Sequence, residues 1–261
     1  EGTPMRRLER GVVARVVTDQ GSVRAKKVVL ATNAWITGLV PEFGRTITVV
    51  SSDMGITQPC PELLDRIGLD HGASVCDSRI FVHYYHATGD GRLLLGKGGN
   101  TFAYGSRMIP SFFEPSTYEW QIRGALNRFF PELCDVGLEA CWNGASDRST
   151  TGFPFFGPLP AQPNVFYGYG YSGNGVTQSL LGGKILRSLV LDMDDEWSRA
   201  GFVGGPRGRF PPEPIRWLGA MLVRNGIRRK EAAEDSGRVP NRVDTWLARF
   251  AQAAGKADSD H

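Results

Sequence analysis

The sequence predicts a mixed α/β fold in which antiparallel strand pairs are combined with amphipathic helices. Two patterns support this fold class. Short runs rich in β-branched residues, separated by turn signals, occupy roughly the first hundred residues, and longer segments with helical spacing of apolar residues follow them. The length of 261 residues suits one large or two small domains, because a typical domain has roughly 150 residues.

The N-terminal hundred residues are predicted to be mainly strands. Asp19-Gln20-Gly21 and Thr88-Gly89-Asp90-Gly91 are strong turn signals between β-branched or aromatic runs, so each indicates a hairpin. The expected strand regions are the hairpin 11–30, the single strand 46–58, and the paired strands 79–86 and 92–96. A short helix over 61–67 follows Pro59.

The rest of the chain is predicted to be mainly helical. The expected elements are helix 116–130, strand 164–168, and helices 175–191, 211–231 and 242–251. Helix 175–191 is apolar on nearly every face, which predicts that it is buried. Residues 253–261 have too little apolar content to order themselves, so we expect a disordered tail.

Composition excludes several classes of protein. Hydrophobic residues make up 41% and charged residues 22%, which are ordinary globular values, and no apolar run approaches the roughly 18 residues of a membrane span. Residues 207–249 carry ten Lys and Arg against five Asp and Glu, so the net charge of +3 is a local feature and does not indicate nucleic-acid binding. Four cysteines without a CxxC pair, and no signal peptide in residues 1–10, favour a reducing cytoplasm.

Glycine is over-represented, with 33 residues, and three of the glycines form a motif. Gly168, Gly170 and Gly173 spell GxGxxG between a strand and a helix, the spacing that lets a backbone approach a pyrophosphate. A dinucleotide-binding motif also needs a second strand that ends in an acidic residue, whereas helix 175–191 runs directly into Asp192-Met193-Asp194-Asp195. The motif alone therefore fits a tightly packed turn as well as a cofactor contact.

Two segments in fixed order carry a resemblance to a known family. VVLATNAW at residues 28–35, followed by GFPFFG and NVFYGYGYSGNGVTQSLLGGKIL within residues 152–186, resembles the later part of the D-amino-acid oxidase-like family of FAD-dependent oxidoreductases. The similarity is to its amine-oxidising branch, which includes glycine, sarcosine and γ-glutamylputrescine oxidases. It covers residues 11–190 and implies an incomplete FAD-binding Rossmann-like domain plus a mixed or antiparallel substrate-binding sheet with flanking helices.

The resemblance also implies how the chain is divided. The family binds the ADP half of FAD through an N-terminal βαβ unit, which residues 1–10 do not supply, so the chain resembles the C-terminal portion of a longer oxidase. The expected parts are FAD-domain strands in 1–45, the substrate-binding sheet in 46–148, a return to the FAD domain in 149–195, a basic helical extension in 196–252 and the tail 253–261. For residues 205–250 we expect packing against the flavin domain or a partner subunit rather than a membrane surface.

The resemblance implies non-covalent FAD, held where the two segments end. The expected cofactor-binding residues are Thr32, Asn33, Ala34, Trp35, Gly170, Tyr171, Ser172, Gly173, Asn174, Gly175, Val176 and Thr177. Backbone N–H groups of Gly173–Thr177 and the helix dipole would stabilise the negative charge of reduced flavin. For Thr32 and Asn33, the alternative is that they cap the following helix. For Trp35, the alternative is a place in the core.

Four residues are expected to be catalytic: Tyr85, His83, Arg148 and Lys97. On a strand, His83 and Tyr85 share one face while Tyr84 and His86 share the other, so at most one pair faces substrate. No metal site is expected, because the side chains of a His-x-x-His pair diverge on a strand.

The roles of Arg148 and Lys97 differ. Arg148 is suited to binding a carboxylate through two hydrogen bonds, although a surface pair with Asp147 is an equal alternative. Lys97 lies near, but not at, the place of the lysine that assists oxygen in the sarcosine-oxidase branch. For each of the sheet residues His83, Tyr85 and Lys97, the alternative is a purely structural role.

The function implied by the resemblance is oxidation of the C–N bond of a small amine or amino acid. Hydride passes to flavin, water hydrolyses the imine, and O₂ reoxidises the flavin with release of H₂O₂. A dehydrogenase that uses another electron acceptor is the alternative among enzymes. A truncated, non-enzymatic chain that binds no flavin and only associates with a partner is the alternative outside them.

Overall fold

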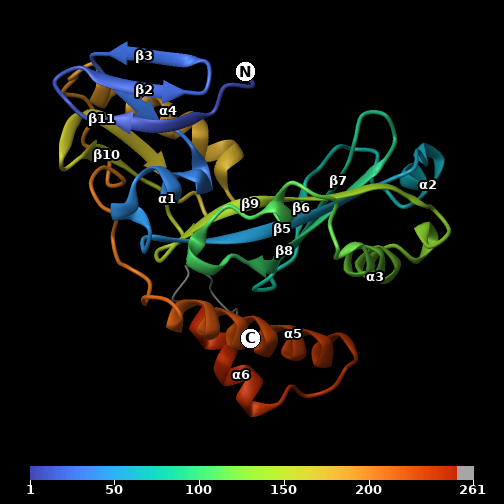
Figure 1. Ribbon diagram of the computed structural model, residues 1–261. Coiled ribbons are helices and arrows are strands. Elements are labelled where there is room, and N and C mark those ends of the chain that lie inside the picture. The colour runs from blue at the N-terminus through green and yellow to red at the C-terminus, as the bar shows by residue number, and fades with distance from the viewer. Residues whose placement is uncertain (252–261) are drawn as a thin grey trace. The chain divides into compact units, whose positions relative to one another are not determined.

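The computed structural model describes residues 1–251 and divides into two compact units (Figure 1). Unit 1 is built from Glu1–Val49, Tyr104–Met108 and Ser146–Glu213. Unit 2 is built from Val50–Ala103, Ile109–Ala145 and the chain from Pro214 onward. The tail predicted for 253–261 lies outside the described residues.

Unit 1 contains two three-stranded sheets. The first has the order β1-β2-β3 and consists of β1 (Met5–Glu9), β2 (Ala14–Thr18) and β3 (Gly21–Ala25). The β2–β3 hairpin is the one that the turn at Asp19-Gln20-Gly21 predicts, whereas β1 was not expected. The second has the order β10-β11-β4 and consists of β10 (Phe155–Leu159), β11 (Gln162–Tyr169) and β4 (Val28–Leu30). Within it, β11 is antiparallel to β10 and parallel to β4.

Helix α4 (Gly175–Val190) packs on the second sheet of unit 1. Ile185 and Leu186 form a buried cluster with Phe156 and Phe166, and no strand follows the helix before residue 215. The prediction that the whole helix is buried is wrong for one face. Val176 is 95% exposed and Leu180 is 72% exposed, because no other described element packs against that face. Short helical turns η1 (Asn33–Trp35), α1 (Ile36–Leu39) and η2 (Pro41–Phe43) follow β4.

Unit 2 is built around a five-stranded sheet of order β6-β7-β8-β5-β9. Its strands are β5 (Ile47–Thr57), β6 (Val75–Cys76), β7 (His83–Ala87), β8 (Leu93–Phe102) and β9 (Leu138–Ser149). Residues 47–49 of β5 and residues 146–149 of β9 belong to unit 1. The β7–β8 hairpin confirms the second predicted hairpin, but the strand begins at His83 instead of Arg79. The Asp77 carboxylate accepts the N–H groups of Arg79 and His83 and holds this segment as a loop.

Helix α3 (Glu119–Phe129) covers one face of this sheet, and short helices complete the unit. Ile122 and Leu126 pack on Leu93 and Leu95, and a Cβ on Gly55 would lie 2.6 Å from Ile122 Cγ2, so the strand approaches the helix closely. The remaining short elements are α2 (Pro61–Arg66), η3 (Tyr104–Ser106, in unit 1), η4 (Pro110–Phe112) and η5 (Pro131–Leu133).

The part of the C-terminal extension from Pro214 onward forms α5 (Ile215–Asp235) and α6 (Arg242–Arg249) and belongs to unit 2, while residues 196–213 belong to unit 1. Helix α5 lies along β8, where Trp217 Nε1 donates to the Phe102 carbonyl at 3.1 Å and Arg224 Nη1 donates to the Asn100 carbonyl at 2.8 Å. Residues 205–213 belong to unit 1, where the Phe210 N–H donates to the Arg45 carbonyl at 2.7 Å. For α5 and α6, packing against the flavin domain stays a prediction. A contact with a partner subunit stays a prediction.

Helix α5 starts four residues later than predicted, after the prolines of residues 211–214. Helix α6 packs against it where Gly226 leaves room for Leu247. No helix within residues 1–251 has the length and apolar character needed to cross a membrane.

Candidate functional site

Two segments that the sequence singles out meet at one edge of the second sheet of unit 1. Val28 pairs with Val165 and Leu30 with Tyr167 in a parallel ladder, so β4 and β11 end side by side. Thr32–Trp35 follows β4, and the glycine turn, defined as residues 168–174, follows β11. Ligands of open α/β sheets bind outside the carboxyl ends of parallel strands. The structure thus brings together all the residues that we expect to bind cofactor.

The backbone at this edge is unusual in both segments. Asn33 has φ +46° and Ser172 has φ +56°, while Gly170 and Gly173 have φ +85° and +95°. Non-glycine residues rarely adopt positive φ, and such strain concentrates at binding and catalytic sites. Trp35 is 46% exposed, so the expectation of a core position for its side chain is not met.

Arg148 and Ser146, at the end of β9, lie beside the glycine turn. Arg148 forms a β-bridge with Tyr171, and a Cβ added to Gly173 would lie 3.6 Å from Arg148 Nη2 and 3.8 Å from Ser146 Oγ. Of the four residues expected to be catalytic, Arg148 is therefore the one that shares a unit with the expected cofactor-binding residues.

Buried polar atoms without a partner lie at the same edge. Thr32 Oγ1, Ser146 Oγ and Gln178 Oε1 are buried and form no hydrogen bond with any part of residues 1–251. Leaving such a group unsatisfied costs about 1–3 kcal/mol, so these atoms point to a ligand that would satisfy them.

The N-terminus of α4 offers donors as well. No side chain caps this end of the helix, and no acidic residue lies in its first turn. The free N–H groups and the helix dipole suit a negatively charged or electron-rich ligand group.

Asp147 is a site residue that sequence reasoning missed. Its side chain is 2% exposed, so the alternative of a surface pair with Arg148 is wrong. Its Oδ2 accepts the N–H of Gly170 at 2.5 Å. Burial raises the pKa of Asp147 to about 6, although hydrogen bonds from the backbone of the turn oppose this rise. An acidic residue within a strand of mainly small and polar residues gives no signal of burial in a single sequence.

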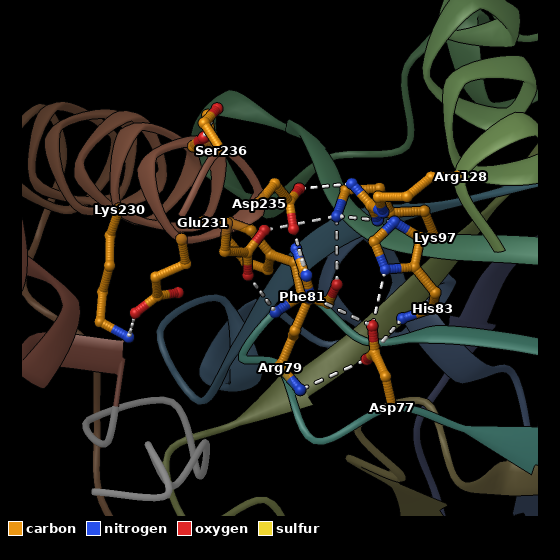
Figure 2. Close-up of polar contacts among 12 residues, drawn as sticks. Asp77, Arg79, Phe81, His83, Lys97, Arg128, Lys230, Glu231, Asp235 and Ser236 are labelled. Carbon is orange, nitrogen blue, oxygen red and sulfur yellow. Dashed lines mark hydrogen bonds and ion pairs between the residues drawn. The ribbon is translucent and has the colours of Figure 1, made fainter. Parts of the chain in front are cut away.

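His83 and Lys97 lie in unit 2 and join a buried ionic cluster (Figure 2). Lys97 is 8% exposed, and its Nζ donates to the Phe81 carbonyl at 3.3 Å and lies 3.4 Å from Glu231 Oε2 on α5. The His83 ring closes the cluster, with Nε2 3.3 Å from Lys97 Nζ and Nδ1 2.8 Å from Asp77 Oδ2. If Nδ1 carries the proton, His83 is neutral and Nε2 accepts from the lysine.

Burial lowers the pKa of both His83 and Lys97. The cluster continues along α5, where Asp235 pairs with both Arg79 and Arg128 (Figure 2). Burial opposes ionisation of Asp235, but its contact with Arg79 outweighs this and lowers the pKa. Sequence separation hid these partners, because Glu231 and Asp235 look like solvated charges of a basic helix.

Tyr85 packs on the helix side of the sheet, and Tyr84 lies on the opposite side. The Tyr85 ring meets that of Phe130 edge to face, with centroids 4.9 Å apart. Tyr84 lies over Gly96, and its hydroxyl is 2.5 Å from Ser52 Oγ. The predicted alternation of faces is thus confirmed, while catalytic roles for Tyr85, His83 and Lys97 stay predictions. Within residues 1–251 no group of three or more His, Cys, Asp or Glu side chains is placed to hold a metal ion.

Comparisons with known proteins identify relatives of this chain. Gamma-glutamylputrescine oxidoreductase of Escherichia coli (strain K12) is 30% identical over 211 residues, which cover 79% of this chain and 47% of that protein. Glycine oxidase of Pseudomonas aeruginosa is 27% identical, with 68% of this chain and 45% of that protein covered. The crystal structure of glycine oxidase from Geobacillus kaustophilus shares the fold with a TM-score of 0.60 at 20% identity, covering 79% of this chain and 52% of that one.

The chain spans about half the length of the curated relatives that it matches. The family model described as FAD dependent oxidoreductase matches residues 1–189, which include the whole glycine turn, Arg148 and the segment after β4. The chain therefore belongs to the DAO family of FAD-dependent oxidoreductases.

Proposed function

We propose that this chain supplies the flavin-ring-facing and substrate-binding parts of an enzyme that oxidises the C–N bond of an amine or amino acid. The observation that carries the proposal is the meeting of Thr32–Trp35 and the glycine turn at the carboxyl ends of β4 and β11. The relatives support the substrate class, since they are named for glycine and γ-glutamylputrescine.

The residues at this edge fit the ring end of FAD. Thr32 Oγ1 and Ser146 Oγ need hydrogen-bond partners, which a polar ring edge offers, and the left-handed glycines leave the backbone accessible. None of the four cysteines lies in residues 146–149 or 168–177, which favours non-covalent binding. When bound, FAD supplies the acceptor for a hydride from the carbon that bears nitrogen; the imine product hydrolyses in water, and O₂ is the expected final acceptor, giving H₂O₂.

The chain's own groups then have separate tasks. The N–H groups of Gly175, Val176 and Thr177, at the start of α4, stabilise negative charge that develops on the ring. The Arg148 guanidinium, close to Gly173, binds and orients a substrate carboxylate.

The proposal also includes a further part of the enzyme, the βαβ unit that binds the ADP half of FAD, because the chain spans about half the length of its relatives. Val176 and Leu180 on α4, together with the 43% exposed Val29 on β4, form apolar surface that such a part would cover. The four free cysteines fit the cytoplasm, a reducing compartment.

The first test is the visible absorption spectrum of the purified chain after incubation with FAD and removal of free flavin. The same measurement is made on a version extended upstream. We expect the extended version to be yellow. If neither version retains flavin, the proposal is wrong, and the chain is then the truncated, non-enzymatic protein that the sequence also allows.

Thr32→Val gives a second test with an informative sign. The variant removes a buried hydroxyl without a partner, so it should stabilise the flavin-free protein by about 1 kcal/mol and weaken FAD binding. Thr18→Val, on the outer hairpin, is the control that should leave FAD binding unchanged. Unchanged FAD affinity in Thr32→Val would remove Thr32 from the cofactor site.

Amine screening separates the oxidase from the dehydrogenase. The holoenzyme is mixed with glycine, sarcosine or an N-alkylated polyamine, and peroxide release in air is compared with dye reduction without oxygen. Peroxide release identifies O₂ as the acceptor, while dye reduction alone identifies a dehydrogenase.

A further inference from the structure

The Asp147 carboxyl group is buried at the end of β9. The residue is 2% exposed, and its Oδ2 accepts a hydrogen bond from a backbone N–H group. A buried carboxylate of this kind is stable only when several hydrogen-bond donors point at it.

The donors come from the backbone of the glycine turn. Gly170 N–H donates to Asp147 Oδ2 at 2.5 Å, and backbone groups of Tyr171 and Ser172 also stabilise the ionised carboxyl. Gly170 and Ser172 both have positive φ, so the turn that supplies these contacts has left-handed backbone at two positions.

A second set of bonds fixes the turn to the end of β9. Ser172 N–H donates to the Asp147 carbonyl at 3.1 Å, while Ser172 Oγ accepts the Ser149 N–H at 3.1 Å and donates to the Gly170 carbonyl at 3.1 Å. The carboxyl and the Ser172 hydroxyl thus tie both ends of the turn to one strand.

The backbone donors at this place therefore form two groups. The Gly170 amide donates to the Asp147 carboxyl group and the Ser172 amide to the Asp147 carbonyl, whereas the first turn of α4 has neither a side-chain cap nor an acidic residue. The second group is the one left for a ligand. The naive interpretation of GxGxxG, in which the first glycine amides bind a phosphate, does not apply to this chain.

We infer that Asp147 is a positioning residue, which holds the glycine turn so that the N-terminus of α4 is the part left to bind the cofactor. The identity of the cofactor in this inference rests on the proposed function. The contact between Asp147 and the glycine turn is independent of it.

Protonation should weaken the hydrogen bond from the Gly170 amide, because a neutral carboxyl accepts more weakly, even though burial as a whole favours the neutral form. The pKa of about 6 places the change near neutral pH. Other charged or titratable groups facing Asp147 are few: the phenols of Tyr169 and Tyr171, whose own pKa values are raised by burial and by the carboxylate, and the neighbouring Arg148.

The test compares Asp147→Ala with Asp147→Asn in the whole chain. Without flavin, hydrogen exchange of the Gly170 amide should be at least tenfold faster in the alanine variant and close to wild type in the asparagine variant, which keeps one acceptor. The Gly170 amide chemical shift should titrate near pH 6 in the wild type and stay constant in Asp147→Asn. Asp195→Asn is the control, because Asp195 accepts backbone N–H groups of residues 197 and 198 elsewhere in unit 1.

The same variants are then examined in a version of the protein that retains FAD. We expect the FAD dissociation constant to rise at least tenfold in Asp147→Ala and to lose its pH dependence in Asp147→Asn. Unchanged exchange at Gly170, or faster exchange with unchanged FAD affinity, overturns the inference. Absence of FAD binding in every version overturns the proposed function instead, while the exchange result still decides the role of Asp147.

Discussion

Asp147 in unit 1 and Lys97 in unit 2 are both buried charged residues, yet the two units stabilise them by different means. Asp147 is held by backbone N–H groups of a turn 23 residues further along the chain. Lys97 is held by a carbonyl and by two side chains, one of which belongs to Glu231, 134 residues further along. Stabilisation of a charge by backbone donors requires that one turn keeps its conformation. Stabilisation by side-chain partners requires that a segment distant in the sequence is present.

The two residues also differ in whether their partners lie inside the segment that matches the family. The family model matches residues 1–189, so Asp147 and its donors lie inside it, while Glu231 and Asp235 lie beyond it. The ionic cluster of unit 2 is completed by the C-terminal extension. The extension is therefore a structural component of the sheet in this chain, and not an independent appendage.

The largest expected effect is that of Glu231→Ala. The substitution leaves the buried Lys97 ammonium close to His83 and Arg79 without its carboxylate, which should destabilise the chain by about 3–5 kcal/mol. Urea unfolding measures the loss. Glu234→Ala, which removes a more exposed partner of Lys230, should cost less than about 1 kcal/mol. Equal losses in both variants would contradict a special role for the cluster.

Asp147→Asn should reveal a pH-dependent difference. The pKa of Asp147 rises from 3.8 to about 6 on folding, so folding is favoured by this group at acidic pH and the benefit is lost as pH rises through about 6. The asparagine variant has no such loss. Its stability relative to wild type should therefore increase by about 2 kcal/mol between pH 4 and pH 8, from 1.36 kcal/mol per pKa unit.

The difference in stability between Asp147→Asn and the wild type is measured from their denaturant unfolding midpoints at four pH values. A difference that stays constant across the range would mean that the carboxyl is not buried as described.

Gly182→Ala examines the packing that supports the glycine turn. An added Cβ would lie 2.5 Å from the Tyr171 hydroxyl and 2.8 Å from the Phe156 ring, so we expect a loss of about 1–3 kcal/mol. Gly183→Ala, with open space around its Cβ, should instead gain about 0.5–1 kcal/mol from helix propensity. Thermal unfolding distinguishes the two, and a gain in both variants would show that α4 can shift away from Tyr171.

Asn241→Ala should have the smallest effect. Asn241 Oδ1 accepts the Val243 N–H at 2.8 Å and caps α6, so its removal should cost about 1 kcal/mol. Asn241→Asp keeps the acceptor and is the matched control. If both variants unfold at the wild-type urea concentration, α6 contributes little to the stability of the extension.

The sequence was informative where structure is local. Turn residues defined the hairpins of β2–β3 and β7–β8, and the helices α3, α4 and α6 were found to within a few residues of their ends. The cofactor-binding segments were found by resemblance, and their meeting at one sheet edge follows from the parallel pairing of β4 with β11.

Elements that depend on distant partners were missed or misjudged. The resemblance implies a strand and loop within 140–149, but residue propensity alone does not mark β9, because its Ala, Asn, Gly and Ser residues have low β-propensity and it pairs with β5. The burial of Asp147 depends on the turn at Gly170, and that of Lys97 on α5. Periodicity reports which residues share a face, but not which element covers that face.

The order of the two units along the chain has a consequence for synthesis on the ribosome. Unit 2 is assembled from three separate stretches of sequence, and the last of them begins at Pro214. Glu231 and Asp235, which pair with Lys97 and Arg79, are translated only after Glu213, where the last stretch of unit 1 ends, so the five-stranded sheet gains these ion pairs late. Nascent chains that stop before α5 should therefore be the ones that chaperones and proteases detect.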